Sequence, residues 1–333
     1  MRLASRRRSR LLLPIFVLLA VAMLGPRAHL QEDDARRILA PLPTDLAALP
    51  AWLAASERDA GVLDTAVAAR VVFAGGGATP VRTAWSVVYL HGFSATRQET
   101  APLAEDVARQ LGANLFEARL RGHGLPGDSL GHVTAADWVR DTRRALDIGR
   151  KLGDSVLVIG TSTGGTLGVW LATLPAAQRV GLHTLVLISP NFGPRDKAAA
   201  VLTWPWAAQL LPRVIPYREW TPRNEEQARF WTVRYPSRAL FPMQALVEQV
   251  RDRPLVGYDV PTLVLYNPDD QVVDAVRTET WLAAVAAASP VRLEQVRVTP
   301  VSGEDGHVIA GRVVAPSQTA SLRDRIVQFV QRH

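Results

Sequence analysis

One serine lies in a sequence context that is typical of a catalytic nucleophile. The sequence Gly-Thr-Ser-Thr-Gly at residues 160–164, centred on Ser162, follows an apolar strand-like segment, residues 155–159, and precedes a helix-like segment, residues 165–174. A Gly-x-Ser-x-Gly sequence between a strand and a helix forms a sharp turn that pushes the serine hydroxyl out of the sheet. The glycines remove Cβ atoms that would collide where strand and helix cross. The helix N-terminus favours the negative charge that develops during acyl transfer.

A serine hydroxyl is a poor nucleophile until a general base takes its proton. In hydrolases with this turn, the acid and then the histidine follow the serine along the chain. His307 and His333 are the histidines that lie after the last expected strand. His333 is the terminal residue, whereas His307 lies in a glycine-containing loop, residues 303–308. We therefore expect His307 to be the base that activates Ser162.

Two neighbouring carboxylates, Asp269 and Asp270, directly follow the expected strand of residues 262–266. Both are placed to orient the His307 imidazole. We choose Asp270 because the Asp-x-Val-Val run fits the usual register of this loop, and Asp269 is the alternative. The role of the acid is to fix the imidazole tautomer and to stabilise the imidazolium.

The loop after the expected strand of residues 85–90 has the sequence His-Gly-Phe-Ser. In this type of hydrolase, one oxyanion donor is an amide of that loop and the other is the amide after the nucleophile. These donors are expected to be the N–H groups of Phe93 and Thr163. His91 starts the loop, and we interpret it as a structural residue that holds the loop by hydrogen bonds. His123 lies in a glycine-flanked segment after the next strand, where a histidine could be a ligand, and we favour a tight loop at the carboxyl edge of the sheet instead.

Strand-like and helix-like segments alternate along the chain, which predicts an α/β fold with a mostly parallel sheet and helices on both faces. We expect this core to comprise residues 61–189 and 259–333. The expected strands are residues 66–73, 85–90, 114–120, 155–159, 183–188, 262–266 and 292–298, and the expected helices are residues 100–111, 135–152, 165–174, 274–288 and 317–331.

Residues 190–258 interrupt this alternation and are rich in proline and aromatic residues, with four of the nine tryptophans. Because the segment lies between two expected core strands, we interpret it as an inserted, mostly helical cap. An aromatic cap over the nucleophile predicts a pocket for an apolar acyl or aryl group. Packing within the cap itself explains some of these aromatic residues equally well.

The positive charge of the chain is concentrated at its N-terminus. The formal net charge is +7, yet six arginines precede the first acidic residue, Glu32, and without them 32 basic residues face 31 acidic ones. A body so close to neutrality argues against nucleic acid as a partner. The chain also has no cysteine, which excludes disulfides, thiolate nucleophiles and cysteine metal sites. The chemistry expected of Ser162 requires no metal and no cofactor.

An arginine-rich start followed by an apolar run, residues 11–24, is the pattern of a secretory signal. The run is shorter than the ~20 residues of a comfortable membrane span. We expect residues 1–28 to be either a signal peptide or an uncleaved anchor, in which residues 11–25 contact the membrane. The body is then exported to the periplasm or secreted. Residues 29–60 are expected to form a linker with a helix.

Taken together, these motifs resemble the α/β-hydrolase superfamily, and within it the monoacylglycerol-lipase and lysophospholipase-like serine hydrolases. Many relatives have Met or Gln after the nucleophile, where this chain has Thr163, although the backbone N–H is kept. The resemblance implies cleavage of carboxylic esters, with an apolar acyl group, through an acyl-enzyme on Ser162. It covers about residues 65–331 and rests on His91-Gly92-Phe93, Arg121-Gly122-His123-Gly124, residues 160–164, Asp270 and His307.

Two other functions fit the same scaffold. An aminopeptidase or amidase needs acidic groups near the site to hold the substrate amine, and Glu219, Glu225 and Glu226 in the expected cap are the candidates. A catalytically inactive hydrolase-fold binding protein is the other alternative. Against it, every position of the expected triad carries a competent residue.

Overall fold

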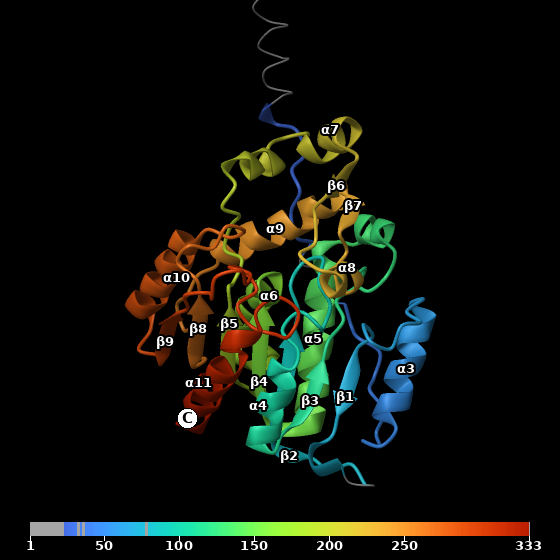
Figure 1. Ribbon diagram of the computed structural model, residues 1–333, viewed down its shortest axis with the longest axis vertical. Helices are drawn as coiled ribbons and strands as arrows, with labels where there is room; N and C mark the ends of the chain where they lie inside the picture. Colours follow the sequence, from blue (N-terminus) through green and yellow to red (C-terminus); the bar gives the residue numbers. More distant parts are fainter. Residues whose placement is uncertain (1–22, 32–33, 35–36, 77–78, 333) are drawn as a thin grey trace, which may run out of the picture.

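The computed structural model describes residues 23–31, 34, 37–76 and 79–332 (Figure 1). Most of the expected signal or anchor segment, residues 1–22, therefore lies outside the described residues. Across the described part of the chain, none of the helices has the length and apolar character needed to cross a membrane.

A seven-stranded sheet forms the centre of the molecule, in the order β1-β3-β2-β4-β5-β8-β9. Only the edge strand β1 is antiparallel to its neighbour, and the other strands pair in parallel. This sheet confirms the expected α/β fold. Its strands are β1 (Arg70–Val72), β2 (Thr83–Leu90), β3 (Asn114–Glu117), β4 (Gly153–Thr161), β5 (Leu182–Ile188), β8 (Thr262–Tyr266) and β9 (Leu293–Arg297).

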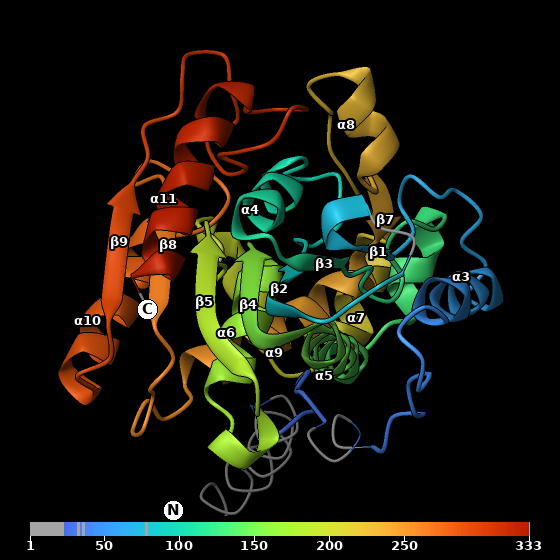
Figure 2. The same ribbon diagram turned by 90° about the horizontal axis from the view of Figure 1, so that it is seen from below.

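Helices cover both faces of the sheet (Figure 2). One face packs against α4 (Leu103–Leu111) and α11 (Thr319–Gln331). The other face packs against α5 (Ala135–Leu152), α6 (Thr163–Ala172), α9 (Leu240–Arg251) and α10 (Ala275–Ala288). A further helix, α3 (Leu49–Asp59), lies beyond the β1 edge (Figure 2).

The two cores follow from the alternation of side chains along each strand. In β4, Val156 and Val158 belong to the core under α5 and α6, whereas Leu157 and Ile159 belong to the core under α4 and α11. Because both faces are covered, the central strands are apolar almost throughout. The long α5 begins where Thr134 and Asp137 form reciprocal hydrogen bonds between side chain and backbone, a capping box.

The element boundaries differ from expectation mainly at the β1 edge. The expected strand of residues 66–73 is reduced to three residues of β1, and the strand from residue 114 ends at Glu117. β1 is the edge strand with a partner on one side only, and its pairing with β3 extends over three residues. The expected bounds of α5 and β8 agree with the structure at both ends.

The segment between β5 and β8 contains short elements that lie over the carboxyl ends of the strands (Figure 1). Its last helix, α9, packs against α6 and contributes Leu246 and Val250 to the main core. The other elements are a 3₁₀-helix (Lys197–Thr203), α7 (Ala207–Val214), β6 (Tyr217–Glu219), α8 (Glu225–Phe230) and β7 (Arg234–Pro236), and β6 pairs with β7 as a small antiparallel ribbon.

Candidate active site

Ser162 lies in the turn between β4 and α6 with backbone angles φ 51° and ψ −116°. A non-glycine residue rarely adopts such angles, and neighbouring structure must enforce them. The two glycines of the motif make this turn possible. A Cβ on Gly160 would stand 2.4 Å from the Gly164 carbonyl oxygen, and a Cβ on Gly164 would stand 2.1 Å from the carbonyl oxygen of Leu90. The reason given for these glycines from the sequence is therefore confirmed.

Asp270 and His307 meet at the carboxyl edge of the sheet. His307 Nδ1 lies 2.7 Å from Asp270 Oδ2, and Asp270 Oδ1 accepts hydrogen bonds from the amides of Val272 and Val273. Asp270 is 1% exposed. The alternative carboxylate, Asp269, is exposed to solvent and the structure gives it no contact with the ring. The geometry therefore favours Asp270 over Asp269 as the partner of His307.

The loop that carries His307 is held in place by backbone contacts. Asp305 Oδ1 accepts hydrogen bonds from the amides of His307 and Val308, and the Asn267 side-chain amide donates to the Gly306 carbonyl oxygen at 2.9 Å. Burial disfavours the His307 imidazolium, but the Asp270 carboxylate and its hydrogen bond outweigh burial, so that the pKa of His307 is raised. His307 is thus oriented by Asp270 and able to hold a proton.

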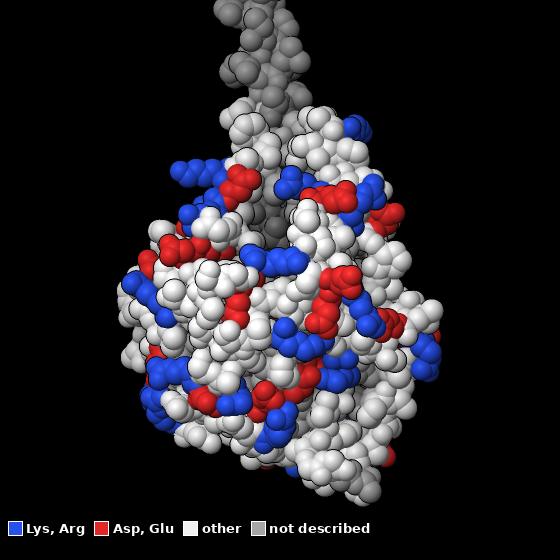
Figure 3. All heavy atoms as spheres, in the orientation of Figure 1, with Lys and Arg blue, Asp and Glu red and all other residues white. Residues whose placement is uncertain are grey.

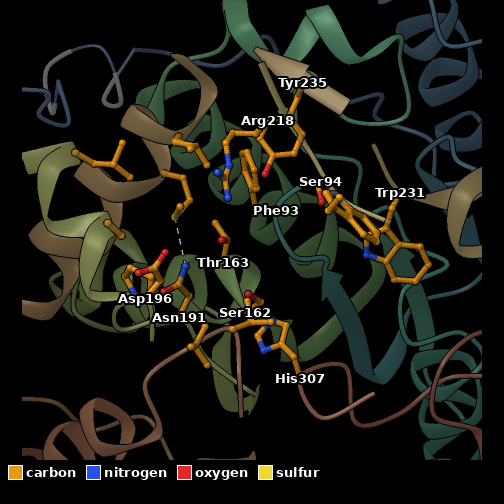
Figure 4. Close-up of a pocket in the computed structure, with 18 of the residues that line it drawn as sticks. Phe93, Ser94, Ser162, Thr163, Asn191, Asp196, Arg218, Trp231, Tyr235 and His307 are labelled. Atoms are coloured by element: carbon orange, nitrogen blue, oxygen red, sulfur yellow. Dashed lines mark hydrogen bonds between the residues drawn. The ribbon is translucent and has the colours of Figure 1, made fainter. Parts of the chain in front are cut away.

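Ser162 and His307 line the same pocket, together with Phe93 and Thr163. In Figure 4 the Ser162 side chain and the His307 ring lie next to each other at one end of this pocket, and Thr163 points into it. Thr163 is the first residue of α6, where helix amides point toward the turn. The structure therefore brings all five expected site residues to one place.

The loop around Phe93 is fixed from both sides by buried side chains. Glu99 Oε2 accepts a hydrogen bond from the Gly92 amide at 2.7 Å, and His123 Nε2 accepts one from the Ser94 amide at 3.0 Å. His91 is fully buried and its Nε2 accepts a hydrogen bond from the Leu120 amide. Burial lowers the pKa of His91 to about 4, so it stays neutral. The structural interpretation of His91 and His123 is confirmed.

Glu99 is a site residue that the sequence analysis missed. It is 2% exposed and lines the pocket, and its Oε2 also accepts a hydrogen bond from the Tyr89 hydroxyl. A Cβ on Gly92 would stand 2.6 Å from Glu99 Oε1 and 3.2 Å from Ser162 Cβ, so only Gly92 separates the two side chains. Burial raises the pKa of Glu99 to about 7, although the Gly92 hydrogen bond opposes this shift. A carboxyl group thus titrates near neutral pH beside the serine.

The pocket is a cavity of about 600 Å³. Its floor is formed by residues of the strand-end loops, and its walls come largely from the segment between β5 and β8. A volume in this range suits a small organic ligand. The wall residues that contribute apolar surface include Leu202, Leu211, Ile215, Trp220, Trp231, Leu240 and Met243.

Comparison with models of known protein families identifies the family of this chain. The family described as serine aminopeptidase, S33, matches residues 82–295, which is more than half of the chain. The chain belongs to this S33 family. The matched region includes Ser162 and Asp270 and ends before His307. Membership confirms the resemblance to α/β-hydrolases that the motifs indicated.

Individual relatives match this S33-family chain over regions of different length. A thermostable monoacylglycerol lipase of Bacillus sp. (strain H-257) is 34% identical over 86 residues, which are 26% of this chain and 34% of that protein. The alignment thus spans about a third of the relative's length.

Solved structures show the same fold at low sequence identity. A structure from work on LipS and LipT, two metagenome-derived lipolytic enzymes, has a TM-score of 0.60 at 20% identity and covers 76% of this chain and 96% of its own. A soluble variant of monoglyceride lipase from Saccharomyces cerevisiae has a TM-score of 0.56 at 13% identity, with 80% and 92% covered. The monoacylglycerol lipase of Paleococcus ferrophilus has a TM-score of 0.55 at 14% identity, with 80% and 98% covered.

Proposed function

We propose that the protein is a serine hydrolase that cleaves carboxylic esters with an apolar acyl group. The observation that carries the proposal is the arrangement of Ser162 and the Asp270–His307 pair. The serine occupies a strained turn, the histidine is oriented by a buried carboxylate, and both line one pocket. A nucleophile, an adjacent base and an orienting acid are the parts that acyl transfer requires.

In the proposed reaction, His307 Nε2 accepts the proton of the Ser162 hydroxyl while the serine oxygen attacks the acyl carbonyl carbon. The carbonyl oxygen becomes an oxyanion, and the N–H groups of Phe93 and Thr163 donate hydrogen bonds to it. Removal of one such donor costs about 3–4 kcal/mol in well-studied enzymes. His307 then gives its proton to the leaving alcohol, and the ester C–O bond breaks.

The resulting acyl-enzyme is hydrolysed by the same groups. Water loses a proton to His307 Nε2 and attacks the acyl carbon, and His307 returns that proton to Ser162 as the carboxylic acid leaves. Asp270 stabilises the imidazolium that forms in both halves of the reaction. All steps use side chains and amides of this chain, and the proposal needs neither metal nor cofactor.

The pocket walls support an apolar acyl group as the part of the substrate that is recognised. Leucine, tryptophan and methionine side chains form much of the lining, and each buried methylene of an acyl chain contributes about 0.8 kcal/mol. Relatives described as a monoacylglycerol lipase and as lipolytic enzymes also support a lipid ester as the substrate.

The family name raises the aminopeptidase alternative again, but the acidic residues expected to bind a substrate amine do not support it. Glu219, Glu225 and Glu226 are all exposed, and none of them lines the pocket. Glu226 lies 3.7 Å from Arg312. The carboxylates that were expected to bind a substrate amine therefore lie outside the pocket, although the Glu99 carboxyl group lines it beside the serine.

A series of p-nitrophenyl esters from acetyl to decanoyl, beside alanine p-nitroanilide, tests the proposal with the purified full chain. We expect kcat/KM to rise with acyl length and the anilide to be a far poorer substrate. Preference for the acetyl ester would contradict the apolar acyl pocket, and preference for the anilide would favour an aminopeptidase. A folded chain that hydrolyses none of them would favour the binding-protein alternative.

A further inference from the structure

Large apolar side chains are exposed together where the described chain begins and at α7. Leu24 is 84% exposed and Val214 is 79% exposed, and Met23, Trp204 and Leu210 are also exposed. Figure 1 shows the start of the described chain beside α7, and Leu211 of α7 lines the pocket. Exposed apolar surface of this extent usually contacts a partner or a membrane.

The chain at residues 25–30 is docked on the body and is part of its fold. The Trp206 amide donates a hydrogen bond to the Pro26 carbonyl oxygen at 2.9 Å. Gly25 lies directly against the Trp206 indole, since a Cβ there would overlap Nε1 at 1.9 Å. Ala28 packs against the cluster around Leu202, and Leu30 is 5% exposed in the main core. The point from which the preceding chain departs is therefore fixed beside α7.

The geometry of α7 separates an outer stripe from a pocket-facing one. Leu210 and Val214 are four residues apart and share one exposed side of the helix. Leu211 and Ile215, one position further along, line the pocket. The wall of the pocket and the exposed apolar surface are thus two sides of the same short helix.

The charge around α7 fits a lipid surface. Figure 3 shows mostly uncharged atoms around α7, with a belt of both basic and acidic side chains below them. Arg213 and Arg218 are exposed close to the apolar stripe in sequence. Apolar side chains flanked by arginine are the composition of a surface that enters the headgroup region of a bilayer.

The sequence before Met23 indicates that a lipid bilayer covers this exposed apolar surface. Residues 11–24 are an apolar run broken only by Pro14, and four arginines lie at positions 6, 7, 8 and 10 before it. We propose that residues 23–30 and α7 form a docking face that rests on a lipid bilayer, with the pocket mouth beside the lipid. Residues 11–24 associate with that bilayer and remain attached to the body. The entry of a lipid ester from the bilayer into the pocket rests on the proposed function, whereas the docking face does not.

Site-specific labels measure this docking directly, because the chain has no cysteine and each introduced cysteine is unique. The full chain is reconstituted into vesicles of phosphatidylethanolamine and phosphatidylglycerol. An environment-sensitive fluorophore is attached at Leu210→Cys, at Val214→Cys or at the control Val81→Cys. Val81 is 61% exposed and precedes β2 at the opposite end of the sheet (Figure 1).

The expected result is a blue-shifted emission at positions 210 and 214 that nitroxide-labelled lipid quenches, with neither effect at position 81. Equal, aqueous emission at all three positions would overturn the docking face, since the chain would then be tethered only through its N-terminus. A blue shift without lipid quenching would also overturn it, because a second copy of the chain would cover the face.

Activity gives a second readout. Leu210→Glu combined with Val214→Glu should lower hydrolysis of a long-chain monoacyl ester presented in vesicles by about tenfold or more, while hydrolysis of a soluble butyryl ester is unchanged. Val81→Glu is the matched control and should change neither rate. An unchanged vesicle rate in the double variant would contradict delivery from the bilayer. If the unaltered chain hydrolyses neither ester, the proposed function fails. Quenching by nitroxide-labelled lipid then still shows whether the docking face contacts the bilayer.

Discussion

The strand-end loops and the segment between β5 and β8 contribute to the same pocket in different ways. The loops place Ser162, His307 and Phe93 through buried hydrogen bonds from residues such as Asp270 and His123. The intervening segment consists of short elements, many of them exposed, and mainly lends apolar side chains. Under the proposed function, the sheet therefore positions the reacting groups and the intervening segment selects the acyl group.

The largest effect expected in this comparison comes from the carboxylate behind His307. Asp270→Asn should lower kcat by about 10⁴-fold, because an amide holds the wrong imidazole tautomer and does not stabilise the imidazolium. Asp269→Asn is the matched control one residue away, and its exposed side chain predicts little change. Steady-state kinetics on a butyryl ester compare the two, and an equal loss in both would contradict the assignment.

The turn itself is tested by adding a methyl group. Gly164→Ala places a Cβ 2.1 Å from the Leu90 carbonyl oxygen, so backbone must move, and we expect a loss of about 1–3 kcal/mol in the free energy of unfolding together with most of the activity. Gly168→Ala on the same helix meets only the flexible end of Leu185, at 2.8 Å. Thermal unfolding should show a much smaller loss for Gly168→Ala; the reverse order would refute the close approach of α6 to the end of β2.

A change in the pocket wall should alter selectivity without altering the chemistry. Leu211→Trp adds bulk from α7, and we expect decanoyl ester hydrolysis to fall by about tenfold while acetyl ester hydrolysis stays near its original rate. The ratio of kcat/KM values across the ester series measures this. A parallel loss on both esters would mean that α7 supports the catalytic residues and would weaken the division between the two regions.

The smallest effect concerns Glu99, whose carboxylate raises the pKa of His307. Glu99→Gln keeps an acceptor for the Gly92 amide but removes the negative charge, so the pKa of His307 should fall. His307 then stays neutral down to a lower pH. The acid limb of the kcat/KM profile should therefore move to lower pH by less than about one unit. Glu304→Gln, which alters a carboxylate bonded to Ser317, is the control. A shift to higher pH would contradict the coupling.

Local sequence was sufficient where a residue's role depends on its own turn. The Ser162 turn and the structural role of His91 follow from short motifs after apolar strands. The preference for Asp270 over Asp269 needed the contact with His307 in the folded chain. Glu99 was missed because its position depends on contacts across the fold. It follows Phe93 by six residues, yet its carboxylate returns to the Gly92 amide and faces the serine from β4.

The segment between β5 and β8 was harder to predict for a similar reason. Its proline and aromatic content indicated an insertion, but not that β6 and β7 would pair, nor that α9 would join the main core. The docking of residues 25–30 against Trp206 joins positions far apart in sequence, and no local pattern signals it. Only the contacts in the folded chain reveal such pairings.

The central claim is that Ser162 is an activated nucleophile. Incubation of the full chain with a fluorophosphonate probe, followed by peptide mass analysis, measures this most directly. We expect a single adduct on the peptide that contains Ser162, absent from Ser162→Ala, and a labelling rate that falls as His307 becomes protonated at low pH. A folded chain that gains no adduct, or gains one that persists in Ser162→Ala, would contradict the account.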